Sequence, residues 1–246
     1  MSAIITTEAV VINSYDFSNT SKIVVLYTQK LGKISALIKA GRDKNSKVGR
    51  SADILNLISI VLYNKDIREV QLLTQADMVA YFSNIREDYE TLLYAHAVLE
   101  LFQYLVKEHE ENQRLYAGLR KILYRFDQKE EPPPITFLRF FVFFIELAGY
   151  ELSTRHCSIC GKIFDPMKSS AGFNNTAGVL CSECTQKMTL TVPVNQELFS
   201  ALHCLKSGTP DISLTQVQAS RLISMLESFL KYHIPEFQGL KSIKSI

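Results

Sequence analysis

Apolar and polar residues alternate in short runs over the first third of the chain, with turn residues between the runs. β-branched residues are frequent in these runs, and both features are typical of β-strands. The pattern predicts strands at residues 6–15, 21–28, 32–40, 54–63 and 69–74. Because short strands without a helical period can remove their exposed edges by closing, we expect a small five-stranded β-barrel of the OB type.

Beyond about residue 84 the apolar positions follow the 3.6-residue period of an α-helix. An amphipathic helix is predicted from there to about residue 111, and a second over residues 115–126. Three prolines at 132–134 then interrupt the chain and favour the start of a new helix, which Gly149 can end. Residues 135–148 are apolar nearly all round, so we expect this helix to be the buried centre of a helical domain.

The helical pattern returns near the C-terminus, where Asn195 and Thr215 are suitable N-caps for helices over residues 196–206 and 215–231. We therefore expect an α+β chain with several domains. The predicted divisions are an OB-fold domain at residues 1–80, a helical domain at 81–150 and 193–246, and an insert at 151–192.

The insert carries two Cys-x-x-Cys pairs, Cys157 with Cys160 and Cys181 with Cys184, separated by twenty residues. Zn²⁺ prefers four tetrahedral ligands, and each such turn brings two thiolates to one ion. Because all four positions are then filled by protein, we expect one structural Zn²⁺ in a small ribbon.

Other interpretations of these cysteines are redox chemistry and another metal. A redox-active Cys-x-x-Cys pair is typically found beside a βαβ unit, and the sequence shows no such pattern. A zinc deaminase has Pro directly before its second Cys-x-x-Cys pair, where this chain has Leu180. His156 could also be a ligand, although none is needed. Cys204, beside His203, is interpreted as a small buried residue rather than half of a catalytic pair.

The net charge is only +2, so a nucleic-acid partner can be argued only from where charges gather. Residues 39–50 hold five basic residues against Asp43, and Lys30 and Lys33 precede them. We expect a mobile loop, too polar and glycine-rich to pack, that either binds phosphates or is simply solvated. Nearby aromatic residues could stack on bases or belong to the core: Tyr15, Phe17, Tyr27 and Tyr63.

Arg120, Lys121, Arg125 and Lys129 form a weaker basic cluster, which we interpret as a solvated helix face. The sequence contains no P-loop, dinucleotide-binding or serine-hydrolase motif, and we expect no enzymatic activity. The N-terminus lacks the features of a signal peptide, and the most apolar run, residues 135–150, is short and contains charges. We therefore expect a soluble cytoplasmic protein without a membrane partner.

Several segments together resemble the bacterial DNA recombination and repair protein family RecO. They are the five-strand pattern, "LIKAGRDKNSKVGRSADIL", "FLRFFVFFIELAGYELSTRHCSICGK", "AGVLCSEC" and the terminal "FLKYHIPEFQGLKSIKSI". The resemblance covers essentially the whole chain, and its most specific part is the apolar helix that ends in Gly-Tyr shortly before Cys157.

The resemblance implies an OB fold, a helical domain and a zinc ribbon whose ligands are the four paired cysteines. It implies binding of single- and double-stranded DNA, annealing of complementary strands at the nucleoid, and loading of RecA, with RecR, onto DNA coated by single-strand-binding protein (SSB). The SSB C-terminal tail is expected to bind the helical domain. The expected DNA contacts are Lys33, Lys39, Arg42, Lys44, Lys47 and Arg50.

Two other functions are compatible with the same residues. The near-neutral net charge suits a protein–protein adaptor whose OB fold is only a scaffold. A zinc enzyme is disfavoured, since a Cys₄ site leaves no open coordination position.

Overall fold

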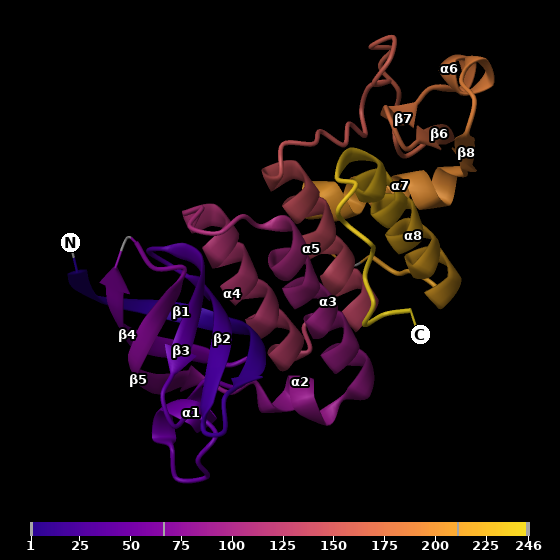
Figure 1. Cartoon of the computed structure of the whole chain (residues 1–246). Helices are drawn as coiled ribbons and strands as arrows, with labels where there is room; N and C mark the ends of the chain where they lie inside the picture. Colours follow the sequence, from indigo (N-terminus) through magenta and orange to yellow (C-terminus); the bar gives the residue numbers. More distant parts are fainter. Residues whose placement is uncertain (1, 66, 211, 245–246) are drawn as a thin grey trace. The chain divides into compact units, whose positions relative to one another are not determined.

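The computed structural model describes residues 2–65, 67–210 and 212–244, and the chain folds as two compact units (Figure 1). One unit is formed by Met1–Glu130 with Lys241–Ile246, and the other by Glu131–Leu240. Within the described residues, no helix is long and apolar enough to cross a membrane.

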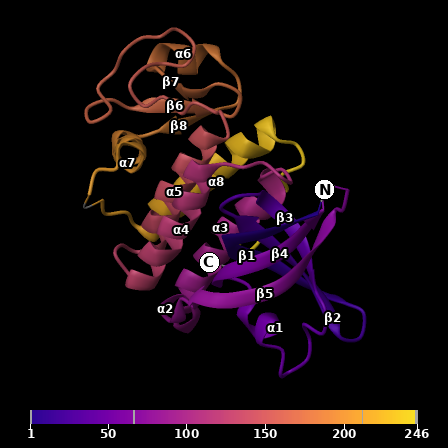
Figure 2. The same cartoon turned by 90° about the vertical axis from the view of Figure 1, so that its left-hand side faces the viewer.

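Five strands of the first unit close into a barrel (Figures 1 and 2). They are β1 (Ser2–Phe17), β2 (Ser21–Thr28), β3 (Gly32–Ile38), β4 (Leu57–Lys65) and β5 (Val70–Ala80), hydrogen-bonded in the order β1-β2-β3-β5-β4. β3 and β5 pair in parallel, whereas β1 with β2, β1 with β4, β2 with β3 and β4 with β5 pair antiparallel. Apolar side chains fill the interior, among them Ala9, Val24 and Ile60. The predicted five-stranded barrel is confirmed.

Two strands are longer than the alternation predicts. β1 pairs with β4 through its first half and with β2 through its second, and a register shift between Val11 and Asn13 lets it bend between them. β5 continues to Ala80, past the predicted end at residue 74, because it stays paired with β4 as far as Ala80 opposite Leu57. The alternation does not reveal this extension, since Met78 and Val79 are both apolar and both exposed.

The connection between β3 and β4 packs against the barrel, so the expectation that residues 39–50 do not pack is wrong. The short helix α1 (Lys47–Ser51) begins after Ser46, whose hydroxyl accepts a hydrogen bond from the Gly49 N–H at 3.1 Å. Gly41 and Gly49 are buried, and a Cβ on Gly49 would collide with the Gly41 carbonyl. These glycines allow close approach of two backbone segments here, rather than flexibility.

Three helices complete the first unit. The predicted helix from residue 84 is divided into α2 (Ser83–Glu87) and α3 (Tyr89–Leu105), because Asp88 is extended and caps α3 through a hydrogen bond from the Thr91 N–H. α4 (Gln113–Gln128) follows. Tyr27 of β2 packs edge-on against Phe102 of α3, which joins this helix to the barrel.

The second unit is organised around α5 (Pro133–Leu147), which is buried on most sides as predicted. α5 packs against both α7 (Gln196–Ser207) and α8 (Gln216–His233). Asn195 and Thr215 cap these two helices, as predicted from the sequence. Between α5 and α7 lies the ribbon, with the elements β6 (Ala171–Asn174), β7 (Gly178–Leu180), α6 (Ser182–Lys187) and β8 (Thr191–Val194).

Candidate metal centre and nucleic-acid interface

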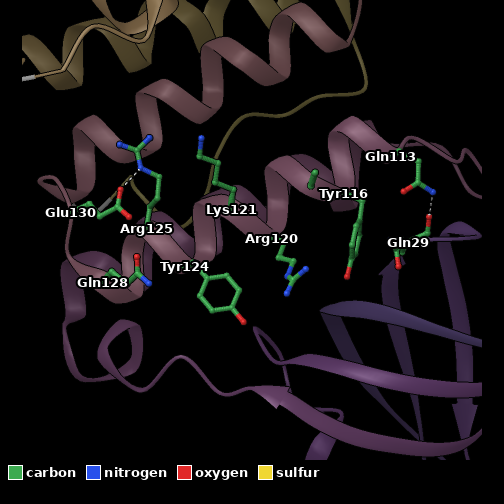
Figure 3. A pocket seen from close by; sticks show the side chains of 10 residues that line it. Gln29, Gln113, Tyr116, Arg120, Lys121, Tyr124, Arg125, Gln128 and Glu130 are labelled. Atoms are coloured by element: carbon green, nitrogen blue, oxygen red, sulfur yellow. Dashed lines mark hydrogen bonds and ion pairs between the residues drawn. The ribbon is translucent and has the colours of Figure 1, made fainter.

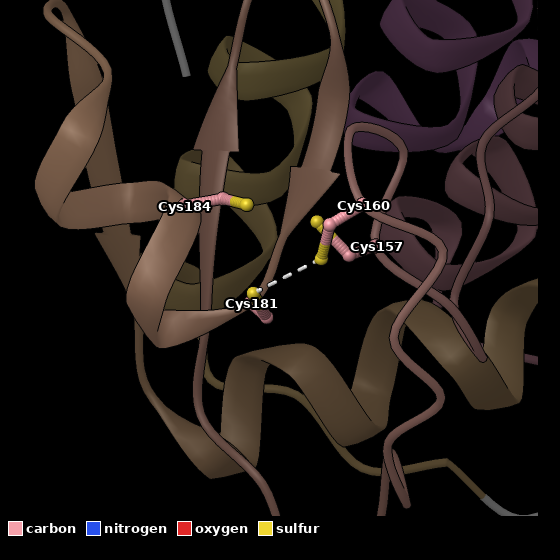
Figure 4. Close-up of side chains that lie close together, drawn as sticks. All are labelled: Cys157, Cys160, Cys181 and Cys184. Atoms are coloured by element: carbon pink, nitrogen blue, oxygen red, sulfur yellow. Dashed lines mark hydrogen bonds between the residues drawn. The ribbon is translucent and has the colours of Figure 1, made fainter.

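The four paired cysteines come together in the ribbon (Figure 4). Their sulfur atoms all lie within 4.8 Å of one another, and the Sγ atoms of Cys160 and Cys181 are 3.7 Å apart. Sulfurs bound tetrahedrally at ~2.3 Å from one Zn²⁺ lie about 3.8 Å from each other, so the arrangement suits a single such ion. Cys157, Cys181 and Cys184 are buried, and Cys160 is exposed.

Backbone hydrogen bonds bring the two cysteine turns together. The Gly161 N–H donates to the Cys157 carbonyl at 2.9 Å and closes the first turn, with Gly161 at a φ of +70°. The Ser158 N–H donates to the Val179 carbonyl at 2.9 Å, which attaches this turn to β7 just before Cys181. Lys162 also pairs with Glu183 across the two turns at 2.6 Å. The sulfurs are therefore positioned by the fold itself.

The environment shifts the acidity of two of these thiols in opposite directions. Burial raises the pKa of Cys157, but the backbone N–H groups of Cys160, Cys181 and Ile159 outweigh burial and bring the pKa down to about 6. Burial and the three other thiols raise the pKa of Cys184 to about 12. Four thiolates this close repel one another, and a divalent cation among them supplies the missing counter-charge. The cluster can hold a metal ion.

The other candidate ligands lie outside this cluster. His156 is exposed, and its Nε2 is 3.8 Å from a Glu151 carboxylate oxygen. Cys204 lies on α7, as the sequence suggests, and its neighbour His203 contacts the Thr154 hydroxyl at 2.8 Å instead of the thiol.

The basic segment is attached to the barrel at several points. The Arg42 N–H donates to the Thr20 carbonyl at 2.9 Å, and its guanidinium contacts Asp16 at 3.1 Å and the Ser18 carbonyl at 2.9 Å. At the other end of the segment, the buried Lys22 ammonium donates to the Ala52 carbonyl at 3.1 Å. The segment is therefore a packed projection beside the β1–β2 turn.

Five basic side chains of this segment reach the solvent: Lys39, Arg42, Lys44, Lys47 and Arg50. Among the described residues, the ammonium groups of Lys39 and Lys44 make no ion pair or hydrogen bond. Lys47 pairs with Asp77 at 2.9 Å, but both side chains are mostly exposed, so this pair is weak. The Arg50 guanidinium donates to the Lys44 carbonyl at 3.2 Å, and within the described residues it makes no ion pair. The segment thus presents cations that are unpaired or only weakly paired, and these can bind phosphates instead.

Two family models match the chain. "Recombination protein O N terminal" matches residues 1–82, and "Recombination protein O C terminal" matches residues 86–242. The chain belongs to the recombination protein O (RecO) family. The resemblance inferred from the sequence is confirmed.

Curated relatives named DNA repair protein RecO match nearly the whole chain. The protein of Chloroherpeton thalassium is 26% identical over 96% of this chain and 95% of its own length. That of Chlorobium limicola is 26% identical over 94% and 93%, and that of Rhodopirellula baltica is 27% identical over 86% and 78%.

In this RecO chain, Lys33 lies away from the exposed cations. It is buried, and its ammonium donates to the Gln103 carbonyl at 3.0 Å and lies 3.7 Å from Glu108. Lys33 therefore satisfies a carbonyl at the C-terminal end of α3, where a cation is favourable. Burial lowers its pKa, against the opposing effect of Glu108. The side chain is occupied inside the fold, and we leave it out of the proposed DNA surface.

The four aromatic residues considered as base-stacking candidates differ in their exposure. Tyr27 is fully buried against α3, and burial raises its pKa to about 12, so it belongs to the core. Tyr15, Phe17 and Tyr63 are 48%, 50% and 44% exposed, which leaves their rings accessible to a base. Phe17 ends β1 beside the turn that Arg42 contacts.

Sequence reasoning missed Lys22, whose ammonium is buried and also pairs with Asp53 at 3.0 Å. The available sequence signal is period-two alternation in β2, which places Lys22 on the same face as Val24 and Leu26, two residues of the barrel core.

Proposed function

We propose that this chain is a DNA-binding repair mediator that acts without chemistry of its own. The supporting observation is the packed basic segment, which holds five exposed cations against Asp43 beside exposed aromatic rings. Cations bind the phosphates of single- and double-stranded DNA, whereas the rings favour unpaired bases. The proposed contacts are Lys39, Arg42, Lys44, Lys47 and Arg50.

This surface can promote annealing of complementary strands. Lys and Arg side chains offset the repulsion between two phosphate backbones, and base pairing supplies the driving free energy. No general base, nucleophile or open metal position is needed for that process. The activity should fall steeply as salt rises, because counterion release contributes much of the binding.

We further propose that the chain acts with RecR to load RecA onto DNA coated by SSB, and that its helical part receives the SSB C-terminal tail. The support is family membership, since these roles come with the resemblance to RecO. We propose the cytoplasm, at the nucleoid, as the site of action. RecA is then an indirect partner.

The four-cysteine cluster holds one structural Zn²⁺ in this proposal. All four ligands come from the protein, and three of the four cysteines are buried with Leu180 in a small apolar cluster. Such a site stabilises the ribbon and leaves no position for a substrate.

The test is annealing of two complementary fluorescent oligonucleotides by the purified protein across a salt series. We expect acceleration at low salt that declines steadily as salt rises. Absence of both acceleration and single-strand binding at low salt would instead favour the adaptor function.

A further inference from the structure

The first unit has a second basic surface, on α4, that the proposed function does not use. A hollow of about 480 Å³ is lined by Gln29, Gln113, Tyr116, Ala117, Arg120, Lys121, Tyr124, Arg125, Gln128 and Glu130. Three of these residues are cations, the rings of Tyr116 and Tyr124 add apolar surface, and the acidic Glu130 already pairs with Arg125 at 2.9 Å. The lining therefore suits an anion that also carries flat or apolar groups, as a single-stranded nucleic acid does.

The side chains leave α4 on two flanks (Figure 3). Tyr116, Arg120 and Tyr124 point together to one side, and Lys121 and Arg125 point to the other. The Arg120 guanidinium lies 5.8 Å from the centre of the Tyr124 ring. A phosphate backbone that crosses the helix between the flanks meets cations on both sides, with an aromatic ring next to one of them.

The cations are available to a ligand to different degrees. Lys121 is exposed and, within the described part of the chain, makes no ion pair or hydrogen bond. Arg120 is about half exposed and is 3.8 Å from Glu8, a long contact that a phosphate can replace. Glu8 also accepts a hydrogen bond from the Tyr116 hydroxyl at 3.1 Å, which orients that ring.

The strand register relates this hollow to the basic segment at residues 39–50. β1 and β2 pair with Ala9 opposite Thr28 at one end and Phe17 opposite Ser21 at the other. The hollow adjoins the first end through Glu8 and Gln29, and the basic segment adjoins the second through Arg42. At ~3.3 Å per residue the eight residues of β2 separate the two surfaces by roughly 23 Å.

We propose that the α4 hollow is a second contact for single-stranded DNA, with phosphates held by Arg120 and Lys121 and a base placed against Tyr124. This inference rests on the proposed function and adds a second contact region to it. An aromatic ring beside guanidinium and ammonium groups is the combination that binds unpaired bases without sequence preference. Both surfaces belong to one compact unit, so one strand can contact both.

A single tryptophan can report on the hollow, because the natural chain contains none. Tyr124→Trp places an indole in the hollow, and Tyr89→Trp places one at a 70% exposed position outside its lining. Each variant is titrated with an oligothymidine of about 20 nucleotides, longer than a single OB-fold site, while anisotropy of a labelled copy reports overall binding. We expect saturable quenching at position 124 and little at position 89.

Three outcomes are distinguishable. Overall binding without quenching at position 124 overturns this inference and leaves the proposed function intact. Loss of both signals rejects the proposed function and this inference with it. Quenching by oligoglutamate of matched charge, but not by DNA, assigns the hollow to an acidic peptide and overturns the inference.

A charge variant tests the phosphate contact without a new ring. Lys121→Gln should weaken binding of the oligothymidine about threefold or more and lower the slope of log affinity against log salt by about 1. Lys107→Gln, also exposed and in the same unit, is the control and should change neither. A specific contact at Lys121 is rejected if the two variants weaken binding equally or if neither weakens it. This test does not depend on whether Tyr124→Trp folds.

Discussion

The four-cysteine ribbon and the basic segment at residues 39–50 are both short, glycine-containing stretches, yet the structure of the ribbon was predicted from the sequence better than that of the segment. Two Cys-x-x-Cys pairs specify a geometry, because few arrangements of four thiols serve any purpose except surrounding one ion. A count of lysines and arginines specifies only that charge is available. The sulfurs meet as predicted, whereas the basic segment packs where a mobile loop was expected. Spacing therefore predicts structure better than composition does.

The largest effect should come from breaking the ribbon. Cys160→Ser removes one ligand of the proposed Zn²⁺, and structural zinc binding contributes about 10–16 kcal/mol in isolated zinc-finger peptides at neutral pH. We expect loss of bound zinc and a melting transition of the unit Glu131–Leu240 that is lowered or absent. Metal analysis and calorimetry measure both quantities.

Cys204→Ser is the matched control for this variant, since Cys204 lies on α7 outside the cluster. It should keep its zinc and its melting temperature. Zinc content and melting in Cys160→Ser equal to those of the unaltered protein would contradict a structural metal at this cluster.

A smaller effect, confined to DNA, should follow from reversing charge on the basic segment. The double variant Lys39→Glu, Lys44→Glu changes two exposed side chains. Their ammonium groups make no ion pair or hydrogen bond with the described residues, so folding should be unaffected. We expect affinity for single-stranded DNA to fall at least tenfold at low salt, with a shallower salt dependence. Fluorescence anisotropy over a salt series measures both.

The same charge change in the ribbon sharpens the comparison. Lys168→Glu with Lys187→Glu reverses two exposed cations there and should leave DNA affinity nearly unchanged. If the ribbon variant weakens binding as much as the segment variant does, DNA contacts are not concentrated on residues 39–50.

How much of the molecule was predictable depended on whether the signal was local. The five strands, the N-caps Asn195 and Thr215 and the apolar α5 arise from local patterns, and each is present, although β1 and β5 extend beyond their predicted ends. The division of the first long helix at Asp88 was missed, because a cap inside a continuous apolar period gives little warning. The packing of Gly49 on Gly41 depends on contacts between backbone segments that no period records.

Membership in a charged segment was also a poor guide to the role of a single lysine. Lys33 and Lys39 are six residues apart, yet one is buried under α3 and the other is exposed. Period-two alternation places Lys33 on one face of β3, but it is α3 and the segment after it, which pairs with Lys33 at Glu108, that make this residue buried. The basic residues of α4 were likewise interpreted as a solvated helix face. The sequence did not indicate the hollow there, because part of its lining, Gln29, comes from the distant barrel segment.

The smallest effect on DNA should therefore come from Lys33, whose contribution is to stability. Lys33→Met keeps the aliphatic stem but leaves the Gln103 carbonyl without its donor, which costs about 1–3 kcal/mol for a buried acceptor. We expect the melting temperature of the first unit to fall. At a temperature where both proteins are folded, we expect DNA affinity within about twofold of the unaltered protein, because a free-energy change below about 0.5 kcal/mol is typical of neutral substitutions. Unchanged stability with a tenfold loss of affinity would show that Lys33 contacts DNA after all. The buried ammonium would then have to leave the end of α3 when DNA binds, and the distinction between packed and exposed lysines in this unit would no longer predict which of them bind phosphate.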